Sequence, residues 1–534
     1  MIRPKHLKRL EWALSVILSA TVLFFLAVRF AHAGALWRDE CAVVNLARMP
    51  SVGEIVRNFQ HEAFPVPFPL LVRAYTTVFG TSDPALRAFG FIVGLALVSA
   101  VWVTAKVIGR GPPLIALALL GFNATVVCWG TTVRGYGLGA TFVVLTFGAF
   151  VALLIRPSTS RLIFATLTSL VAVQCLVHNL AIVAAFTVSA GFVSLVRHDL
   201  KHLVLFLGIL ALCFISFLPY LDAYSSSWSE IVEFPVTARL LWNQFTFALG
   251  NPNPEMAWFW RIAFVVLLIM AARQLSFSRR DRSSTEWKLV LFALLSSIVS
   301  PLFYYMFLQT LSYLTRSWYF IALIAAVAIS LDCLAAVLCN ATWARIGRLS
   351  FATIALVVLP INAWPTITQR QTNIDFVAQK IASEAKPTDL IVLSPWQYGI
   401  SFNRYYHGRT PSITLPAISD LRVHRYDLFR EKMLAEHPIA DVLEKIRQTL
   451  GDRNRVWIVG GIKLPPNGQA PRDLPPARCE KGVWDNVAYS DAWQEQLGAF
   501  IREHSERGQT VSLPITGPVN PFEDVSLMLV EGWQ

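Results

Sequence analysis

The chain has 534 residues, of which 55% are hydrophobic and only 15% charged, and its mean hydropathy is +0.51. One soluble core could not bury that much apolar surface, so the composition excludes an ordinary soluble protein and predicts one that crosses a membrane several times. The formal net charge is +12. Because positive charge beside membrane spans usually sets topology, we expect no nucleic-acid partner.

Apolar runs of about 17 to 25 residues, long enough to cross a bilayer as helices, recur until about residue 366 and then stop. The sequence therefore predicts a mainly α-helical, polytopic membrane bundle. Its spans, about eleven, lie near residues 12–33, 86–105, 113–131, 136–155, 162–177, 181–196, 203–221, 257–272, 289–308, 318–338 and 349–366. The first run is long for a signal peptide, so we interpret AHA at 31–33 as part of an uncleaved anchor.

The stretch FPVPFPLLVRAYTTVFG, residues 64–80, is also apolar, but it is short and contains Arg73 and three prolines. We predict a juxtamembrane helix that lies in, or dips into, the outer membrane interface. With this stretch excluded from the spans, the N-terminus and the loops after even-numbered spans hold most of the basic residues of the membrane part. This distribution predicts a cytoplasmic N-terminus.

The composition changes after residue 366. The segments 386–395, 455–461 and 525–532 have the pattern of buried strands, and 438–450 and 491–508 have helical spacing. We therefore expect a transmembrane domain over 1–366, with an outward catalytic loop at 34–85, and a small α/β domain over 367–534. An odd number of spans after a cytoplasmic start places this second domain outside the inner membrane, in the periplasm.

Seven cysteines do not form a disulfide scaffold in a chain of this size. Only Cys41 and Cys479 fall in segments predicted to face outward. The pattern does not decide whether these two residues form a disulfide or stay free thiols.

Polar residues that are costly near a membrane gather on the predicted outer side. The set consists of Asp39, Glu40, His61, Glu62, Arg134, Tyr136, His178 and Arg316. An ion or proton path would instead need ionisable residues at the middle of several spans, and the spans are nearly free of charge. The pattern favours chemistry at the outer membrane boundary over transport.

A sugar carried on a polyprenyl phosphate fits this location, because its lipid lies in the bilayer and its reactive carbon lies at the boundary. Transfer of the sugar needs a base for the acceptor nucleophile and positive charge for the leaving phosphate. Asp39 or Glu40 can supply the base. Arg134 and Arg316 can supply the charge, since a guanidinium group makes paired hydrogen bonds with phosphate.

Each of these residues also has a purely structural interpretation. Asp39 and Glu40 can stabilise the start of a juxtamembrane helix, and His61 and Glu62 can be solvated interface residues. Arginines near a span often extend their charged end to the interface, and a histidine such as His178 can bond between helices.

The order of several motifs resembles a known family. Asp-Glu follows the first span, and it is followed by HEAFPVPFPLL (61–71), SDPALRAFGFIVGLALVSAVW (82–102), RGYGL (134–138), LVHNLAI (176–182) and LTRSWYFIAL (314–323). This series resembles the C-type glycosyltransferases of the protein O-mannosyltransferase and lipid A aminoarabinose transferase group. The resemblance covers about residues 12–340, and the C-terminal domain is similar to the periplasmic domain of bacterial members.

The resemblance implies a polyprenyl-phosphate-linked sugar as donor, an inverting transfer, and catalysis by Asp39. Two departures bear on the phosphate contacts and on metal binding: the family's paired prolines are interrupted at Pro65-Val66-Pro67, and RGYGLGATF lacks the family's aspartate. A divalent metal is therefore an open question, with Glu62 and His178 as candidate ligands.

The sequence thus predicts a membrane glycosyltransferase that acts at the periplasmic face of the inner membrane. The alternatives are a transporter or flippase of lipid-linked glycans, an oligosaccharide ligase, and a non-catalytic assembly protein. The sequence does not identify the sugar, the acceptor (a lipid, a glycan or a protein), or the oligomeric state.

Overall fold

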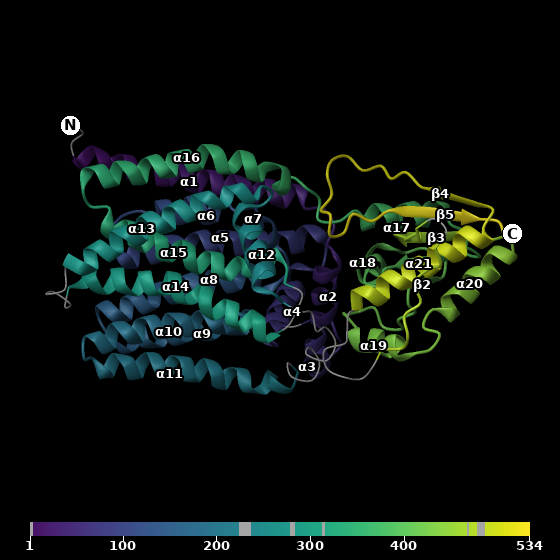
Figure 1. Ribbon diagram of the computed structural model, residues 1–534, viewed down its shortest axis with the longest axis horizontal. Helices are drawn as coiled ribbons and strands as arrows, with labels where there is room; N and C mark the ends of the chain where they lie inside the picture. The colour runs from purple at the N-terminus through teal and green to yellow at the C-terminus, as the bar shows by residue number, and fades with distance from the viewer. Residues whose placement is uncertain are drawn as a thin grey trace.

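The computed structural model describes residues 4–62, 64–223, 236–277, 284–311, 315–466, 469–477 and 486–534. Long helices lie side by side in a bundle, and a smaller domain with a β-sheet covers one end of it (Figure 1). The N-terminus lies at the opposite end of the bundle. This arrangement agrees with the predicted fold class.

Nine helices of the described residues are long and apolar enough to cross a membrane. They are α1 (Pro4–His32), α5 (Asp83–Ile108), α8 (Gly135–Ile155), α10 (Asn179–Val196), α11 (Leu200–Phe217), α13 (Ala257–Phe277), α14 (Thr285–Leu311), α15 (Ile321–Leu338) and α16 (Thr342–Ile367). They correspond to nine of the predicted spans. A tenth predicted span is the shorter apolar helix α9 (Thr159–Cys175).

The remaining predicted span, 113–131, forms two helices, α6 (Leu114–Gly121) and α7 (Ala124–Gly130). The break occurs at Asn123, whose side-chain oxygen accepts a hydrogen bond from the backbone N–H of Val126 at 2.9 Å. An asparagine that caps a new helix in this way competes with continuation of the previous one. The helix α12 (Ala238–Gly250) was not predicted.

Short helices from the segment between α1 and α5 lie between the bundle and the C-terminal domain (Figure 1). They are α2 (Arg38–Ala47), α3 (Val52–Asn58), the 3-10 helix η1 (Phe59–Glu62) and α4 (Pro67–Phe79). The helix α4 corresponds to the predicted juxtamembrane helix. Its prolines Pro67 and Pro69 stand in the first turn, where a missing N–H breaks no helical hydrogen bond.

The C-terminal domain contains one five-stranded sheet with the order β2-β1-β3-β5-β4. Strands β1 (Leu390–Ser394), β2 (Ser412–Thr414) and β3 (Val456–Gly460) are parallel, whereas β5 (Leu527–Glu531) and β4 (Arg507–Thr510) pair antiparallel. Around the sheet lie α17 (Ile374–Glu384), α18 (Tyr398–Tyr405), α19 (Tyr426–Leu434), α20 (Ala440–Gly451) and α21 (Asn486–His504). Three of the strands and two of the helices match predicted segments, but β4 lies where a helix was expected to continue.

Partly buried polar contacts attach this domain to the bundle. Arg29, near the end of α1, donates a hydrogen bond to the carbonyl oxygen of Gln369 at 2.5 Å. Asp83, at the start of α5, pairs with Arg404 of α18 at 2.8 Å. Cys41 is buried as a free thiol, and Cys479 lies outside the described residues.

Candidate active site

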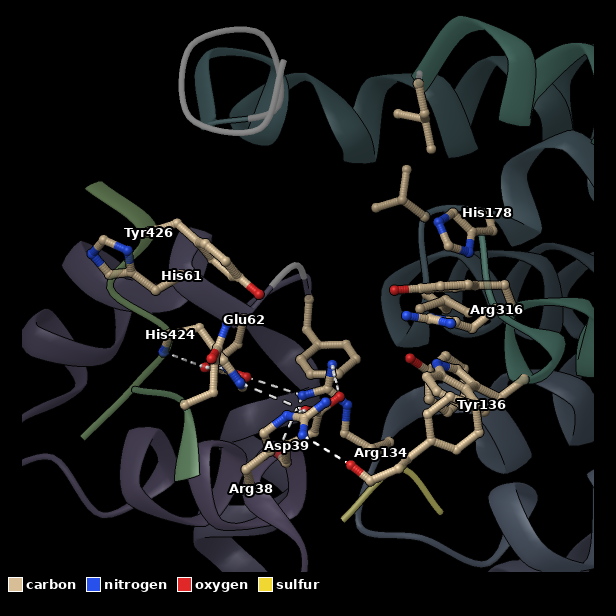
Figure 2. Close-up of a pocket in the computed structure, with 18 of the residues that line it drawn as sticks. Arg38, Asp39, His61, Glu62, Arg134, Tyr136, His178, Arg316, His424 and Tyr426 are labelled. Carbon is tan, nitrogen blue, oxygen red and sulfur yellow. Dashed lines mark hydrogen bonds and ion pairs between the residues drawn. The ribbon is translucent and has the colours of Figure 1, made fainter. Parts of the chain in front are cut away.

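A cavity of about 250 Å³ lies where the bundle, the connecting helices and the C-terminal domain meet. Of the eight residues predicted to form the site, all except Glu40 line this cavity: Asp39, His61, Glu62, Arg134, Tyr136, His178 and Arg316. Figure 2 shows Asp39, His61 and Glu62 on one side of the cavity and Tyr136, His178 and Arg316 on the other. Residues that are distant in the sequence therefore converge on one cavity.

Asp39 stands in the first turn of α2, where the helix N-terminus favours a negative charge. Its side chain is 17% exposed. Three cationic or ionisable groups surround the carboxylate: Arg38 Nε at 3.5 Å, His424 Nε2 at 3.6 Å and Arg134 Nη2 at 3.9 Å. None of these contacts is a close hydrogen bond, so the carboxylate oxygens can accept one from a bound molecule.

Glu62, at the end of η1, is fully buried and tightly bound. Its Oε1 atom accepts hydrogen bonds from the backbone N–H of His424 at 3.0 Å and from His424 Nδ1 at 2.8 Å, and its Oε2 atom accepts one from Arg134 Nη1 at 3.0 Å. Burial by itself raises the pKa of Glu62. The contacts with His424 and Arg134 outweigh burial and hold this pKa below its ordinary value, so Glu62 is ionised.

Arg134 precedes α8 and joins the two carboxylates. Besides its bond to Glu62, its Nη1 atom donates to the backbone carbonyl of Asp39 at 3.2 Å. Its guanidinium group lies 4.1 Å from the centre of the Phe64 ring. Its Nη1 donors are thus used within the protein, whereas its buried Nε atom has no hydrogen-bond partner among the described residues.

Arg316 lies on the other side of the cavity, just before the 3-10 helix η5 (Ser317–Phe320). Its guanidinium group lies 5.4 Å from the centre of the Phe522 ring. Within the part of the chain that the structure describes, no carboxylate forms an ion pair with it within 4.0 Å. Arg316 therefore presents positive charge to the cavity, and its donors are available to an anion.

Aromatic rings line the rest of this side. His178 packs beside Tyr319 and Phe307, with ring centres 5.3 and 5.4 Å apart, and Tyr136 packs beside Tyr319 at 6.0 Å. Burial lowers the pKa of His178 to about 4, so its ring is neutral. Its Nδ1 atom is buried and has no hydrogen-bond partner among the described residues.

Glu40, the second carboxylate of the catalytic prediction, does not line the cavity. Its side chain is fully buried away from the cavity, and Arg87 Nη1 donates to both of its oxygens at 2.8 and 3.0 Å. The backbone N–H of Val133 donates to it as well, at 2.9 Å. A carboxylate held in this way fixes α2 against the bundle, and its oxygens are occupied by hydrogen bonds within the protein.

The candidate metal ligands Glu62 and His178 do not come together. Glu62 is bonded to His424 and Arg134, whereas His178 lies among aromatic rings on the opposite side of the cavity. Across the described ranges, no group of three or more His, Cys, Asp or Glu side chains is arranged to hold a metal ion. Glu62 and His178 therefore do not fit a metal site.

Several residues of the cavity were not predicted. Arg38 comes from α2, and the C-terminal domain contributes Gln397, His424, Tyr426 and Phe522. A polar or aromatic residue in a soluble domain costs little to solvate, so no local pattern distinguished the residues of the C-terminal domain.

The fold and the cavity define a polytopic membrane protein whose C-terminal domain closes a charged site at one end of the bundle. No family model matches the chain, and no curated protein matches its sequence. Among solved structures, the chain is similar to ArnT from Cupriavidus metallidurans bound to undecaprenyl phosphate (12% identity, TM-score 0.47, covering 83% of this chain and 92% of that chain). It is also similar to the oligosaccharyltransferase of Archaeoglobus fulgidus in the apo form (12% identity, TM-score 0.48, covering 84% and 69%).

Both proteins are C-type glycosyltransferases, the group that the sequence motifs resemble. At 12% identity and TM-scores below 0.5, however, these similarities carry no argument about activity.

Proposed function

We propose that this protein is a membrane glycosyltransferase that moves a sugar from a polyprenyl-phosphate donor to an acceptor at the periplasmic face of the inner membrane. One observation carries the proposal: the Asp39 carboxylate, which makes no close hydrogen bond, faces the same cavity as Arg316, which has no ion-pair partner among the described residues. The two groups are those that transfer from a lipid phosphate needs.

In the proposed reaction, the acceptor oxygen attacks the anomeric carbon of the donor while Asp39 takes the proton of the acceptor. The bond between that carbon and the phosphate oxygen breaks, and the polyprenyl phosphate leaves with the electron pair. Arg316 stabilises the charge that develops on the leaving phosphate. Attack from the side opposite the phosphate inverts the anomeric carbon, and the proton then passes from Asp39 to water.

The contacts of the two arginines suggest different roles for them. Arg134 is bonded to Glu62 and to the backbone of Asp39, so it positions the acid. Arg316, without an ion-pair partner among the described side chains, binds the phosphate. The rings of Tyr136, Trp318 and Tyr319 line the cavity beside Arg316 and offer apolar faces to the sugar.

The proposal is tested with purified protein in lipid vesicles, a panel of labelled polyprenyl-phosphate sugars, and a membrane extract as the source of acceptor. Acceptor-dependent release of polyprenyl phosphate and transfer of the label support the proposal. No transfer from any monophosphate donor contradicts it.

The same assay separates the alternatives. Transfer only from diphosphate-linked glycans indicates an oligosaccharide ligase. Movement of an intact lipid-linked sugar across the vesicle membrane, without cleavage of the bond to phosphate, indicates a flippase.

A further inference from the structure

The C-terminal domain contributes side chains directly to the cavity, and one of them touches both cavity carboxylates. We infer that His424 is a positioning residue that holds Asp39 and Glu62 in their working geometry, so that the C-terminal domain is an integral part of the active site. This inference rests on the proposed function, because it assigns His424 to the same reaction.

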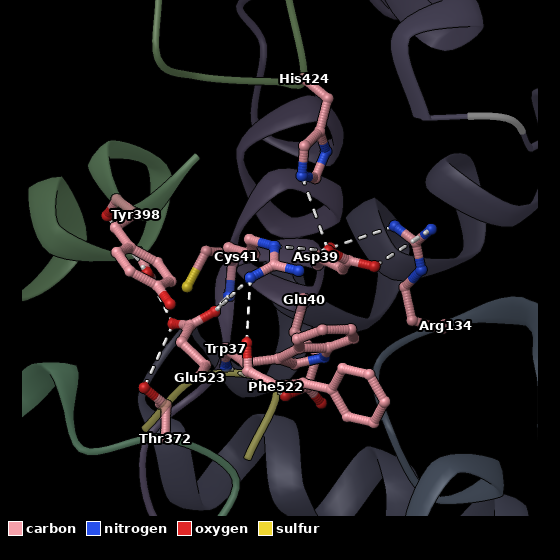
Figure 3. Close-up of polar contacts among 12 residues, drawn as sticks. Trp37, Asp39, Glu40, Cys41, Arg134, Thr372, Tyr398, His424, Phe522 and Glu523 are labelled. Carbon is pink, nitrogen blue, oxygen red and sulfur yellow. Dashed lines mark hydrogen bonds and ion pairs between the residues drawn. The ribbon is translucent and has the colours of Figure 1, made fainter. Parts of the chain in front are cut away.

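The imidazole ring of His424 bridges the two acids. Its Nδ1 atom lies 2.8 Å from Glu62 Oε1, and its Nε2 atom lies 3.6 Å from Asp39 Oδ1. Because the ionised carboxylate of Glu62 can only accept hydrogen bonds, Nδ1 carries the hydrogen of that contact. The ring is therefore oriented by Glu62. Its other nitrogen points toward Asp39, as Figure 3 shows.

The core of the C-terminal domain fixes the position of this ring. His424 is only 8% exposed and stacks on Tyr426, with ring centres 6.1 Å apart. The fully buried Trp396 lies against both rings, at 6.4 Å from His424 and 5.5 Å from Tyr426. His424 therefore reaches the two acids only while this domain is folded and docked.

A second group of the same domain holds the backbone beside Asp39. The buried carboxylate of Glu523 accepts a hydrogen bond from the backbone N–H of Arg38, the first residue of α2, at 2.9 Å. Thr372 and Ser401 donate to the other oxygen of Glu523 at 3.1 and 2.7 Å (Figure 3). A carboxylate at the start of a helix satisfies a free N–H group and stabilises the helix.

The C-terminal domain thus positions Asp39 in two ways, through the backbone of α2 and through the His424 ring. Arg316, which binds the donor phosphate in the proposed reaction, has a different neighbour, Phe522, while the hydrogen bonds of His424 go to Glu62. Loss of His424 should therefore slow the step in which Asp39 takes the acceptor proton, while binding of the donor is kept. The inference predicts a decrease in kcat without a matching change in the KM for the donor.

The experiment compares three variants of the full-length protein. His424→Leu removes both ring contacts, His424→Asn keeps an amide donor near the position of Nδ1, and His437→Leu makes the same change at an exposed histidine of the same domain. We expect kcat to fall at least about tenfold in His424→Leu, with the donor KM within about twofold of wild type. His424→Asn should recover part of the loss, and His437→Leu should behave as wild type.

Hydrogen–deuterium exchange supplies a readout that does not depend on activity. In His424→Leu we expect faster exchange in peptides that cover 59–62 and 38–47, with unchanged protection of the sheet strands. This result also distinguishes the two proposals. If wild-type protein transfers no sugar, the proposed function fails, and the exchange data still decide whether His424 positions the site.

Three outcomes overturn the inference: an unchanged kcat in His424→Leu, equal impairment of the Leu and Asn variants, or an effect on donor KM alone. If His424→Leu does not fold, His424→Asn and Glu62→Gln provide the test. Both remove part of the bridge, and both should lower kcat more than donor affinity. An effect confined to donor KM in these two variants contradicts the inference.

Discussion

Two clusters of buried charge lie toward opposite ends of the bundle. They differ in whether the carboxylate at their centre can accept a hydrogen bond from a further molecule. In the first, Glu11 of α1 accepts hydrogen bonds from Arg345 and Arg348 of α16, each at 2.6 Å. These two helices lie side by side along the bundle (Figure 1). In the second, the carboxylate of Asp39 faces a cavity, and its nearest ionisable neighbours lie 3.5 to 3.9 Å away.

The difference separates a structural ion cluster from a reactive one. A carboxylate that is saturated by two guanidinium groups joins helices and has no capacity for a substrate. A carboxylate that faces a cavity without a close hydrogen bond keeps its lone pairs available to a bound molecule. The same distinction applies within α2, where Glu40 is saturated by Arg87 and its neighbour Asp39 is not.

The largest effect is expected for Asp39→Asn. An amide cannot take the acceptor proton, so the rate of sugar transfer should fall about 1,000-fold, within the range typical of a lost general base. The melting temperature should change little, because the carboxylate makes no close hydrogen bond. Initial rates and thermal melting of the purified variant check both statements. Transfer at the wild-type rate would remove Asp39 from the role of base.

Glu11→Gln should have the opposite profile. It leaves Arg345 and Arg348 facing each other without their carboxylate, which should lower the free energy of unfolding by about 3 kcal/mol. Activity per folded molecule should stay at the wild-type value, because Glu11 does not line the cavity. Thermal melting beside an activity assay at low temperature measures the two quantities. A folded but inactive Glu11→Gln protein would contradict the separation of the clusters.

Arg316→Ala removes the arginine assigned to the donor phosphate. Because charge-assisted hydrogen bonds contribute about 1.5 to 3 kcal/mol each, we expect kcat/KM for the donor to fall about 10- to 100-fold. Arg57→Ala, which removes an exposed arginine of α3, is the matched control and should leave kcat/KM unchanged. Equal effects of the two substitutions would mean that Arg316 contributes only general charge.

The smallest expected effect is a pH-dependent change in the melting temperature of Glu62→Gln. Its pKa is lower in the folded protein than its ordinary value of 4.5, so its bonds to His424 and Arg134 stabilise the protein above pH 4.5. This stabilisation is lost as the pH falls through the folded-state pKa. Glu62→Gln should therefore melt below wild type at neutral pH, and the difference should shrink in acid. A difference that does not vary with pH would show that ionised Glu62 is not the stabilising group.

Much of this arrangement could be predicted from the sequence. Membrane spans need long apolar runs, and charged residues near a membrane are costly, so both stand out in a single sequence. Asp39 and Glu40 could not be distinguished in advance. Successive residues of a helix point about 100° apart, and only the packing of α2 shows which of the two meets Arg87 and which meets the cavity.

The contribution of the C-terminal domain could not be predicted either. His424 lies between β2 and α19, and Phe522 precedes β5, in segments whose polar and aromatic residues resemble any solvated loop. Their importance arises from docking, which brings them against α2 and Arg316. Docking depends on contacts between residues hundreds of positions apart, such as Asp83 with Arg404, and these leave no local pattern.

The most direct test of the account is a density map of the protein in lipid with a polyprenyl phosphate added. The account predicts density for the phosphate in the cavity, within hydrogen-bond distance of Arg316 and on the side that faces Asp39, with the isoprenoid chain leading into the membrane. A phosphate bound at the opposite end of the bundle, or a cavity that stays empty at saturating lipid, would contradict it.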